Sequence, residues 1–110
     1  MIELPWPPKE LNPNVRMHWR KRNPIKVVYR DACHLLTYNA KVTVPSDGPI
    51  AITIDFYPPD NRHRDDDNMI SAFKAGRDGV ANGLGVNDRR FQPVYRFNGP
   101  VKGGKVIVHV

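Results

Sequence analysis

IAITIDFY, residues 50 to 57, is the stretch that decides the fold of this chain. Bulky apolar residues occupy every second position, and small or polar residues fill the positions between them. The apolar set is Ile50, Ile52, Ile54 and Phe56. Because side chains alternate between the two faces of a strand, this period predicts a half-buried strand with one apolar face. Pro58-Pro59 then ends it, since proline cannot donate to a sheet ladder.

Apolar residues at helical spacing on both sides of this strand predict two helices. Asn23-Pro24 combines a favourable N-cap residue with a proline at the first helical position, which predicts a helix over residues 24–40. Its apolar stripe contains Ile25, Val28, Ala32, Leu35 and Leu36. A second helix is predicted over residues 67–82, from the stripe Met69, Ile70, Phe73, Val80 and Leu84. Gly83 suits the left-handed C-cap of that helix.

The remaining segments complete an α+β domain. Residues 2–4 predict a short edge strand, and residues 9–23 a polar, basic surface loop without hydrophobic period. Residues 94–97 and 106–110 predict two strands joined by NGPVKGG as a hairpin. The order β-α-β-α-β-β predicts a single domain over residues 1–110, with two helices packed on a small mixed sheet.

Composition narrows the function classes. The 110 residues hold 17 Lys and Arg against 11 Asp and Glu, a formal net charge of +6, which favours a polyanionic partner such as nucleic acid. No apolar run approaches the roughly 18 residues of a membrane span, and no apolar run follows a basic N-terminus. Cys33 is the only cysteine, so an internal disulfide and a thiolate zinc site are excluded. A cytoplasmic location is expected.

RHRDDDN, residues 62–68, admits two interpretations. Asp is favoured at N-caps and in first helical turns, so the aspartates can simply start a helix. However, three adjacent carboxylates repel one another and exceed what capping needs. If the chain is still extended there, Asp65 and Asp67 point to one side, an arrangement that suits Mg²⁺ or Mn²⁺. An EF-hand is excluded because Ile70 stands where its loop needs glycine.

A further acidic residue, Asp88, follows the predicted second helix. Alone it is an ordinary turn residue, but a strand returning antiparallel to that helix would bring it towards Asp65 and Asp67. Arginines flank both acidic segments; they are Arg62, Arg64, Arg89 and Arg90. Carboxylates that hold a metal inside a cationic rim are typical of a phosphodiester-cleaving site, because the metal activates water and the rim binds phosphates.

Four segments in this order resemble the RusA-type Holliday junction resolvases. They are LPWPP (4–8), RDDDN (64–68), NDRRF (87–91) and GGKVIV (103–108), which together cover nearly the whole chain. The resemblance implies a homodimeric, Mg²⁺-dependent endonuclease of DNA recombination and repair from a bacterium or phage, with Mn²⁺ able to substitute. It would nick two strands of a four-way junction symmetrically and leave 5′-phosphate ends. The catalytic, metal-binding aspartates carry over onto Asp65, Asp67 and Asp88.

The chain departs from the family pattern at one position. Ser71 stands where the family has a lysine four residues after the second aspartate of its motif. Lys74 lies seven residues after Asp67, on roughly the same face of a continuous helix, and its long side chain would lean back towards the metal site. We expect Lys74 to take the role of the missing lysine; the alternative is an ordinary solvated lysine near Asp78.

The loop before the first helix supplies the other expected DNA contacts. With the flanking arginines, the predicted DNA-binding set is Arg16, Arg20, Lys21, Arg22, Arg62, Arg64, Arg89 and Arg90. Trp6 and Trp19 are candidates for stacking on unpaired bases, although Trp6 between prolines is typical of a packing residue. Two alternative functions stay open: a non-catalytic nucleic-acid-binding module, and a nuclease of flaps or forks rather than junctions.

Overall fold

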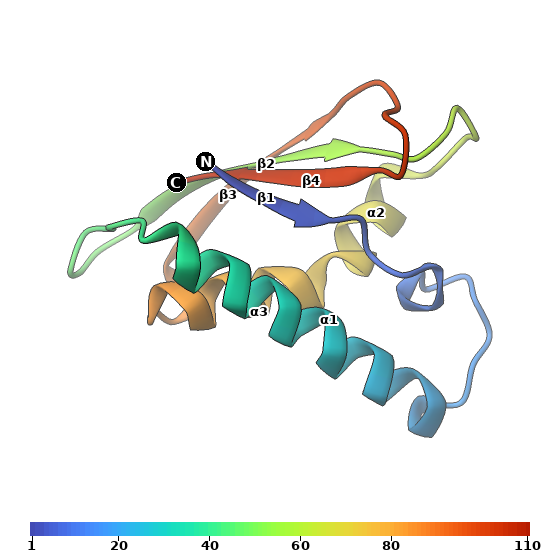
Figure 1. Cartoon of the computed structure of the whole chain (residues 1–110), viewed down its shortest axis with the longest axis horizontal. Coiled ribbons are helices and arrows are strands. Elements are labelled where there is room, and N and C mark those ends of the chain that lie inside the picture. The colour runs from blue at the N-terminus through green and yellow to red at the C-terminus, as the bar shows by residue number, and fades with distance from the viewer.

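Strand β2 (Ile50–Tyr57) forms where the alternation predicts it and lies inside a four-stranded mixed sheet. The computed structural model describes residues 1–110, and the strand order is β1-β4-β2-β3 (Figure 1). Strand β4 (Lys105–His109) runs antiparallel to both β1 (Ile2–Pro5) and β2. Strand β3 (Phe91–Phe97) runs parallel to β2. The predicted α+β class and the edge strand at the N-terminus are confirmed.

Three α-helices lie on one face of this sheet (Figure 1). They are α1 (Trp19–Ala40), α2 (Asp66–Ala72) and α3 (Lys74–Leu84). Two short 3₁₀ turns, η1 (Lys9–Leu11) and η2 (Asp88–Arg90), flank the helical layer in sequence. None of the helices combines the length and apolar character needed to cross a lipid bilayer.

The core lies between the helices and the sheet. The apolar face of β2 is almost completely buried, with no member above 2% exposed; it consists of Ile50, Ile52, Ile54 and Phe56. The helices cover it with Cys33, Phe73 and Val80, each at most 1% exposed. The predicted single-faced strand is therefore confirmed, and its burial removes from water the apolar area that drives folding.

Helix α1 begins at Trp19, well before the predicted start at residue 24. His18 is its N-cap, and the Nδ1 atom of His18 accepts a hydrogen bond from the Arg20 backbone N–H at 3.1 Å. Pro24 lies inside the helix, where its missing N–H leaves only the Arg20 carbonyl without an intrahelical partner. The prediction of Asn23 as N-cap was wrong because one lost bond near the N-terminus does not stop a helix that packs along its length.

The predicted second helix is two helices. The backbone bends at Phe73, whose φ of −86° and ψ of −3° separate α2 from α3. The C-cap of α3 is Gly85, with φ of 71° in the left-handed region, and not Gly83 as predicted. Gly83 is still helical, and its backbone lies directly against Thr37 of α1.

The predicted hairpin between the last two strands is wrong. Strands β3 and β4 lie on opposite sides of β2, so the segment between them crosses the end of β2. It is held there by hydrogen bonds from the Asn98 N–H to the Phe56 carbonyl and from the Val101 N–H to the Pro58 carbonyl, both 2.9 Å. Helices α2 and α3 form the crossover that connects β2 to β3. Because β3 runs parallel to β2, both strands finish at the same edge of the sheet.

Helices α1 and α3 approach each other closely because α3 presents glycine at the contact. A Cβ atom on Gly83 would lie 2.6 Å from the Thr37 Cβ, and one on Gly79 would lie 2.9 Å from the Cys33 Cβ. Both separations are shorter than carbon atoms tolerate, and the neighbouring atoms belong to the buried residues Cys33 and Thr37 of α1 rather than to flexible side-chain ends. The spacing of the two helices therefore depends on these glycines.

Gly79→Ala should lower the free energy of unfolding by about 1–3 kcal/mol, because the added methyl forces α1 and α3 apart in a packed core. Urea denaturation followed by circular dichroism measures this. Gly99→Ala is the matched control: Gly99 has no heavy atom within 4 Å of the added methyl and needs no positive φ. Equal stability of the two variants would contradict the proposed helix contact.

Candidate functional site

Asp65 occupies the N-cap position of α2 but does not act as a side-chain cap. Its backbone is extended, with φ of −74° and ψ of 135°, and its carboxylate accepts no hydrogen bond from a backbone N–H of the first turn. The helix instead begins through the Asp65 carbonyl, which accepts from the N–H groups of Asn68 and Met69 at 3.1 Å each. The helix-start interpretation thus leaves the Asp65 carboxylate without a role.

The acidic side chains at this turn are open to solvent. The Asp65 side chain is 67% exposed; its Oδ1 lies 3.3 Å from His63 Nε2, and its Oδ2 accepts a hydrogen bond from Asn68 Nδ2 at 3.5 Å. Asp66 and Asp67 lie in the first turn of α2, are exposed, and form no ion pair. Their negative charges interact favourably with the positive end of the helix dipole. For Asp66 and Asp67, unlike Asp65, the start of a helix is therefore a sufficient explanation.

The Asp65 carboxylate lies at an open groove of about 640 Å³. One wall comes from the segment between β1 and α1, and the other from residues 59–72. About half of its lining residues are polar or charged, among them Lys9, Asn12, Arg62, His63, Asp65 and Asn68. Trp6 closes one side, packed edge-on against Phe56 with ring centroids 6.1 Å apart. Trp6 is therefore a packing residue of the groove wall.

Arg64 anchors this turn. Its guanidinium pairs with the Asp60 carboxylate at 2.9 Å, donates to the Asp60 and Arg62 carbonyls at 3.2 and 3.1 Å, and lies over the Trp6 ring. The hydrogen bond from Arg64 also holds the pKa of the Asp60 carboxyl below its usual range. Arg64 thus shapes the groove from within, through polar contacts that all use its Nη1 atom.

Two more of the predicted DNA-contacting residues are loop anchors. Arg90 donates to the carbonyls of Gly48 and Pro45 at 2.8 and 2.6 Å, and Arg22 donates to the carbonyls of Glu10, at 3.1 Å, and Val15. The other members of the predicted set keep exposed side chains without an acidic partner; they are Arg16, Arg20, Lys21, Arg62 and Arg89.

Asp88 lies at the other end of the sheet from Asp65. It opens η2, next to Arg90, which is bound to the turn that precedes β2. Asp65 instead follows the far end of β2. Because β3 runs parallel to β2, the end of β3 returns towards the Asp65 side and its beginning, near Asp88, does not. The chain has no group of three or more His, Cys, Asp or Glu residues close enough to hold a metal ion.

The expectation that Asp88 joins Asp65 and Asp67 is therefore wrong for a single chain. The break at Phe73 also changes the expected position of Lys74. Lys74 is the first residue of α3, exposed, and separated from Asp67 by the bend, so the two do not share one continuous helical face. Neither Lys74 nor Asp67 belongs to the lining of the groove.

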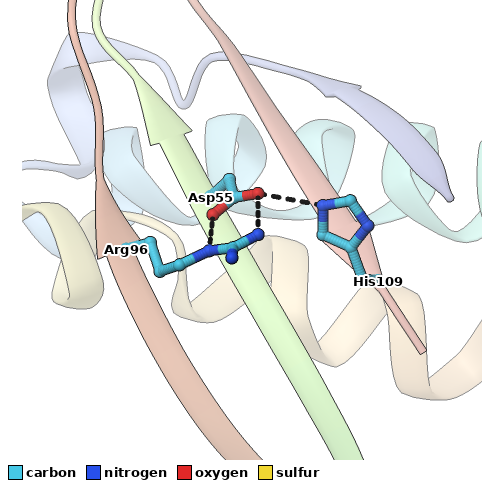
Figure 2. Close-up of polar contacts among 3 residues, drawn as sticks. All are labelled: Asp55, Arg96 and His109. Carbon is cyan, nitrogen blue, oxygen red and sulfur yellow. Dashed lines mark hydrogen bonds and ion pairs between the residues drawn. The ribbon is translucent and has the colours of Figure 1, made fainter.

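A buried polar cluster on the sheet was missed by the sequence analysis. Asp55 on β2 is 3% exposed and accepts two hydrogen bonds from Arg96 on β3, at 2.5 and 2.7 Å (Figure 2). His109 Nε2 on β4 lies 2.9 Å from the second carboxylate oxygen. All three side chains lie on the sheet face opposite the helices (Figure 2). The cluster ties β3 and β4 to the strand between them.

The alternation in β2 placed Asp55 on the solvent side but contained no signal for its partners. Arg96 and His109 become its neighbours only through the strand register. The hydrogen bonds from Arg96, helped by His109, lower the pKa of the Asp55 carboxyl. A buried carboxylate remains charged only when partnered in this way, so the cluster is a structural tie between strands.

Comparison with known proteins gives one relative without a described function. An uncharacterized protein of Xylella fastidiosa is 41% identical over 93 residues, which are 82% of this chain and 61% of that protein. This chain therefore matches only about three fifths of the length of that relative. No protein-family model matches the chain.

Asp55→Asn should lower the free energy of unfolding at pH 7 by about 1–3 kcal/mol, because Arg96 and His109 lose a charged acceptor. The pKa of Asp55 is lower in the folded chain than in the unfolded one, so this contribution is complete above about pH 4. It disappears as the pH falls through the folded-state pKa. Urea titrations at pH 7 and pH 3 should show the difference between variant and parent shrinking.

Asp31→Asn serves as the matched control. Asp31 makes one loose ion pair with Arg30 at 3.7 Å, and its side chain is 66% exposed. Its substitution should change stability by less than about 0.5 kcal/mol at either pH. A pH-independent loss in Asp55→Asn would contradict the stabilising role of the charged carboxylate.

Proposed function

We propose that this chain is a Mg²⁺-dependent endonuclease of branched DNA, with four-way junctions as substrate. The observation that carries the proposal is the Asp65 carboxylate: it stands at a helix start without capping the helix, exposed, at a groove with cationic walls. The resemblance of LPWPP, RDDDN and NDRRF to RusA-type resolvases supports the same activity. A bacterial cytoplasm or a phage-infected cell suits such an enzyme.

The carboxylates of this turn have the chemistry that a magnesium ion requires, although α2 starts at Asp66 and the extended backbone expected from Asp65 to Asp67 is not formed. Mg²⁺ is usually held by one or two carboxylates, keeps several waters, and takes further ligands from substrate phosphates. Asp65 and Asp67 are exposed carboxylates two residues apart, and neither is neutralised by lysine or arginine. A bound Mg²⁺, for which Mn²⁺ can substitute, would supply activation of water and neutralisation of the phosphodiester charge.

The side chains around this turn have separate tasks in the proposal. Arg62 and Lys9, on opposite walls of the groove, bind phosphates on either side of the scissile bond. His63 and Asn68 hold the Asp65 carboxylate in place through their contacts with its two oxygens. Arg64 fixes the turn itself through Asp60. Lys74 remains a candidate for stabilising phosphate charge, from the start of α3.

The position of Asp88 makes a second copy part of the proposal. One chain keeps Asp88 at the opposite end of β2 from Asp65, so Asp88 reaches the same phosphodiester only from a partner subunit. A two-fold dimer would then form two equivalent sites from both chains, which matches the symmetry of a four-way junction and gives paired nicks. Arg89, exposed beside Asp88, would contribute to the same cationic rim.

A non-catalytic nucleic-acid-binding module is the second candidate. The lack of a three-carboxylate group within one chain favours it, as does the fit of Asp66 and Asp67 to an ordinary first helical turn. This alternative predicts salt-sensitive DNA binding that does not depend on divalent metal and is not followed by cleavage.

Asp67→Asn should reduce cleavage of a synthetic four-way junction in Mg²⁺ by about 100-fold or more while junction binding is retained, because a metal-holding carboxylate is lost. Gel assays on junction, fork and duplex substrates over a Mg²⁺ titration measure both properties. Asp66→Asn is the control, since it removes the same charge from the same helical turn. Binding by the parent protein without cleavage at any Mg²⁺ concentration would favour the non-catalytic module.

A mixture of Asp67→Asn and Asp88→Asn chains, unfolded and refolded together, should regain cleavage that neither variant has alone. In a mixed dimer one site combines the intact Asp67 of one chain with the intact Asp88 of the other, and the second site carries both substitutions. About half of the dimers should be mixed, so roughly a quarter of the parental sites return. No recovery would show that Asp88 acts in its own chain or not at all.

A further inference from the structure

The first turn of α1 carries an exposed tryptophan in a basic setting. The Trp19 side chain is 66% exposed at the first residue of the helix. The surrounding segment, residues 16–26, contains five Lys or Arg residues and no Asp or Glu; they are Arg16, Arg20, Lys21, Arg22 and Lys26. Single exposed apolar residues are common, but an exposed tryptophan among cations is the composition of surfaces that bind single-stranded nucleic acid.

The neighbours of Trp19 hold its ring without covering it. The His18 ring is stacked on it with centroids 5.8 Å apart and planes at 29°, and the Arg20 guanidinium lies 5.5 Å from the ring centroid. His18 is itself fixed as the N-cap through its hydrogen bond with the Arg20 N–H. The indole is therefore supported by an ordered helix start while most of its surface remains available for stacking.

The charges of this turn are unfavourable in the isolated chain. Arg20, Lys21 and Arg22 lie at the positive end of the α1 dipole, where cations are disfavoured, and the first turn has no acidic residue. Arg22 donates to the carbonyls of Glu10 and Val15, whereas Arg20 and Lys21 have no acidic partner. Polyanion phosphates would relieve this repulsion, so charge complementarity points to nucleic acid as the occupant.

The same turn is connected to the groove at Asp65. Val15 lines the groove, and Arg22 bonds its carbonyl, so the start of α1 is tied to the groove wall. Figure 1 shows the N-terminal end of α1 reaching beyond the sheet on the side of η1 and α2. Trp19 follows Val15 by four residues in the chain, so it stands near the end of this groove wall.

We propose that Trp19, supported by His18 and Arg20, is a stacking platform for an unpaired base of the DNA strand that leaves the groove. This rests on the proposed function, because base pairs at a branch point of DNA can open and leave unstacked bases beside a duplex. Trp6 has no such role, since its ring packs against Phe56 and lies beneath Arg64. The platform selects substrates with unstacked bases without reading their sequence, because every base has a stacking face.

The test is binding without divalent metal, so that it is independent of cleavage. The parent protein is titrated in EDTA with a 15-mer of thymidine and with a 15-mer that has abasic sites in place of the bases. The two strands carry the same phosphate charge. We expect thymidine to quench the tryptophan fluorescence and to bind about tenfold more tightly than the abasic strand.

Three variants assign the effect to Trp19. Trp19→Phe should keep the preference for thymidine, measured by fluorescence anisotropy of labelled strands, and lose the quenching, because Phe stacks but the remaining signal is that of Trp6. Trp19→Ala should lose both. Tyr38→Ala is the matched control: Tyr38 is an aromatic residue of the same helix, 67% exposed, in the last turn, which has no basic residue.

Equal affinity of the parent protein for the thymidine and abasic strands would overturn the platform. An unchanged preference for thymidine in Trp19→Ala would also overturn it. So would quenching of the tryptophan fluorescence that varies with protein concentration but not with DNA concentration. Cleavage assays test the proposed nuclease separately. If the protein binds thymidine strands more tightly than abasic strands but does not cut DNA in Mg²⁺, the stacking role of Trp19 is supported and the nuclease activity is refuted.

Discussion

Burial of one face of β2 is the constraint on which the rest of the structure depends. Ile50, Ile52, Ile54 and Phe56 are covered by α1 and α3, and these helices reach the required closeness because Gly79 and Gly83 leave room for the α1 backbone. Direct packing of two helices over one strand allows a chain of this length to build a core of ordinary density. It also fixes where the ends of β2 lie; one acidic segment follows the C-terminal end of β2, and the other precedes β3, which starts beside the N-terminal end of β2.

The parallel pairing of β2 and β3 separates these acidic segments. Asp65 follows the end of β2, whereas Asp88 precedes the start of β3, and a parallel pair puts those two points at opposite edges of the sheet. The same topology moves the β3–β4 connection across the end of β2, where Asn98 and Val101 bond it. A metal-dependent site that uses both acidic segments thus requires two chains, and a site built on Asp65 and Asp67 alone requires one.

Three arginines of the predicted DNA-binding set are bound within the fold. Arg22, Arg64 and Arg90 each bond backbone carbonyls of nearby loops, because irregular segments leave carbonyls that need donors. Arg96, outside the predicted set, is bound to Asp55. The exposed members of the predicted set lie near the groove and the first turn of α1, apart from Arg89 beside Asp88. Exposed cations outside the set, such as Lys41 and Lys102, lie elsewhere on the surface.

The sequence by itself determined the α+β class, the buried face of β2, the edge strand at Ile2 and the exposed acidic turn at Asp65. Each follows from a local pattern: a period of two, a period near 3.6, or a polar run between apolar segments. Only the tertiary structure decided the place of β3 beside β2, the earlier start of α1 at Trp19, and the Asp55 cluster. These depend on which segments meet, since Arg96 and His109 become neighbours of Asp55 through strand register and carry no mark of it in their own sequence.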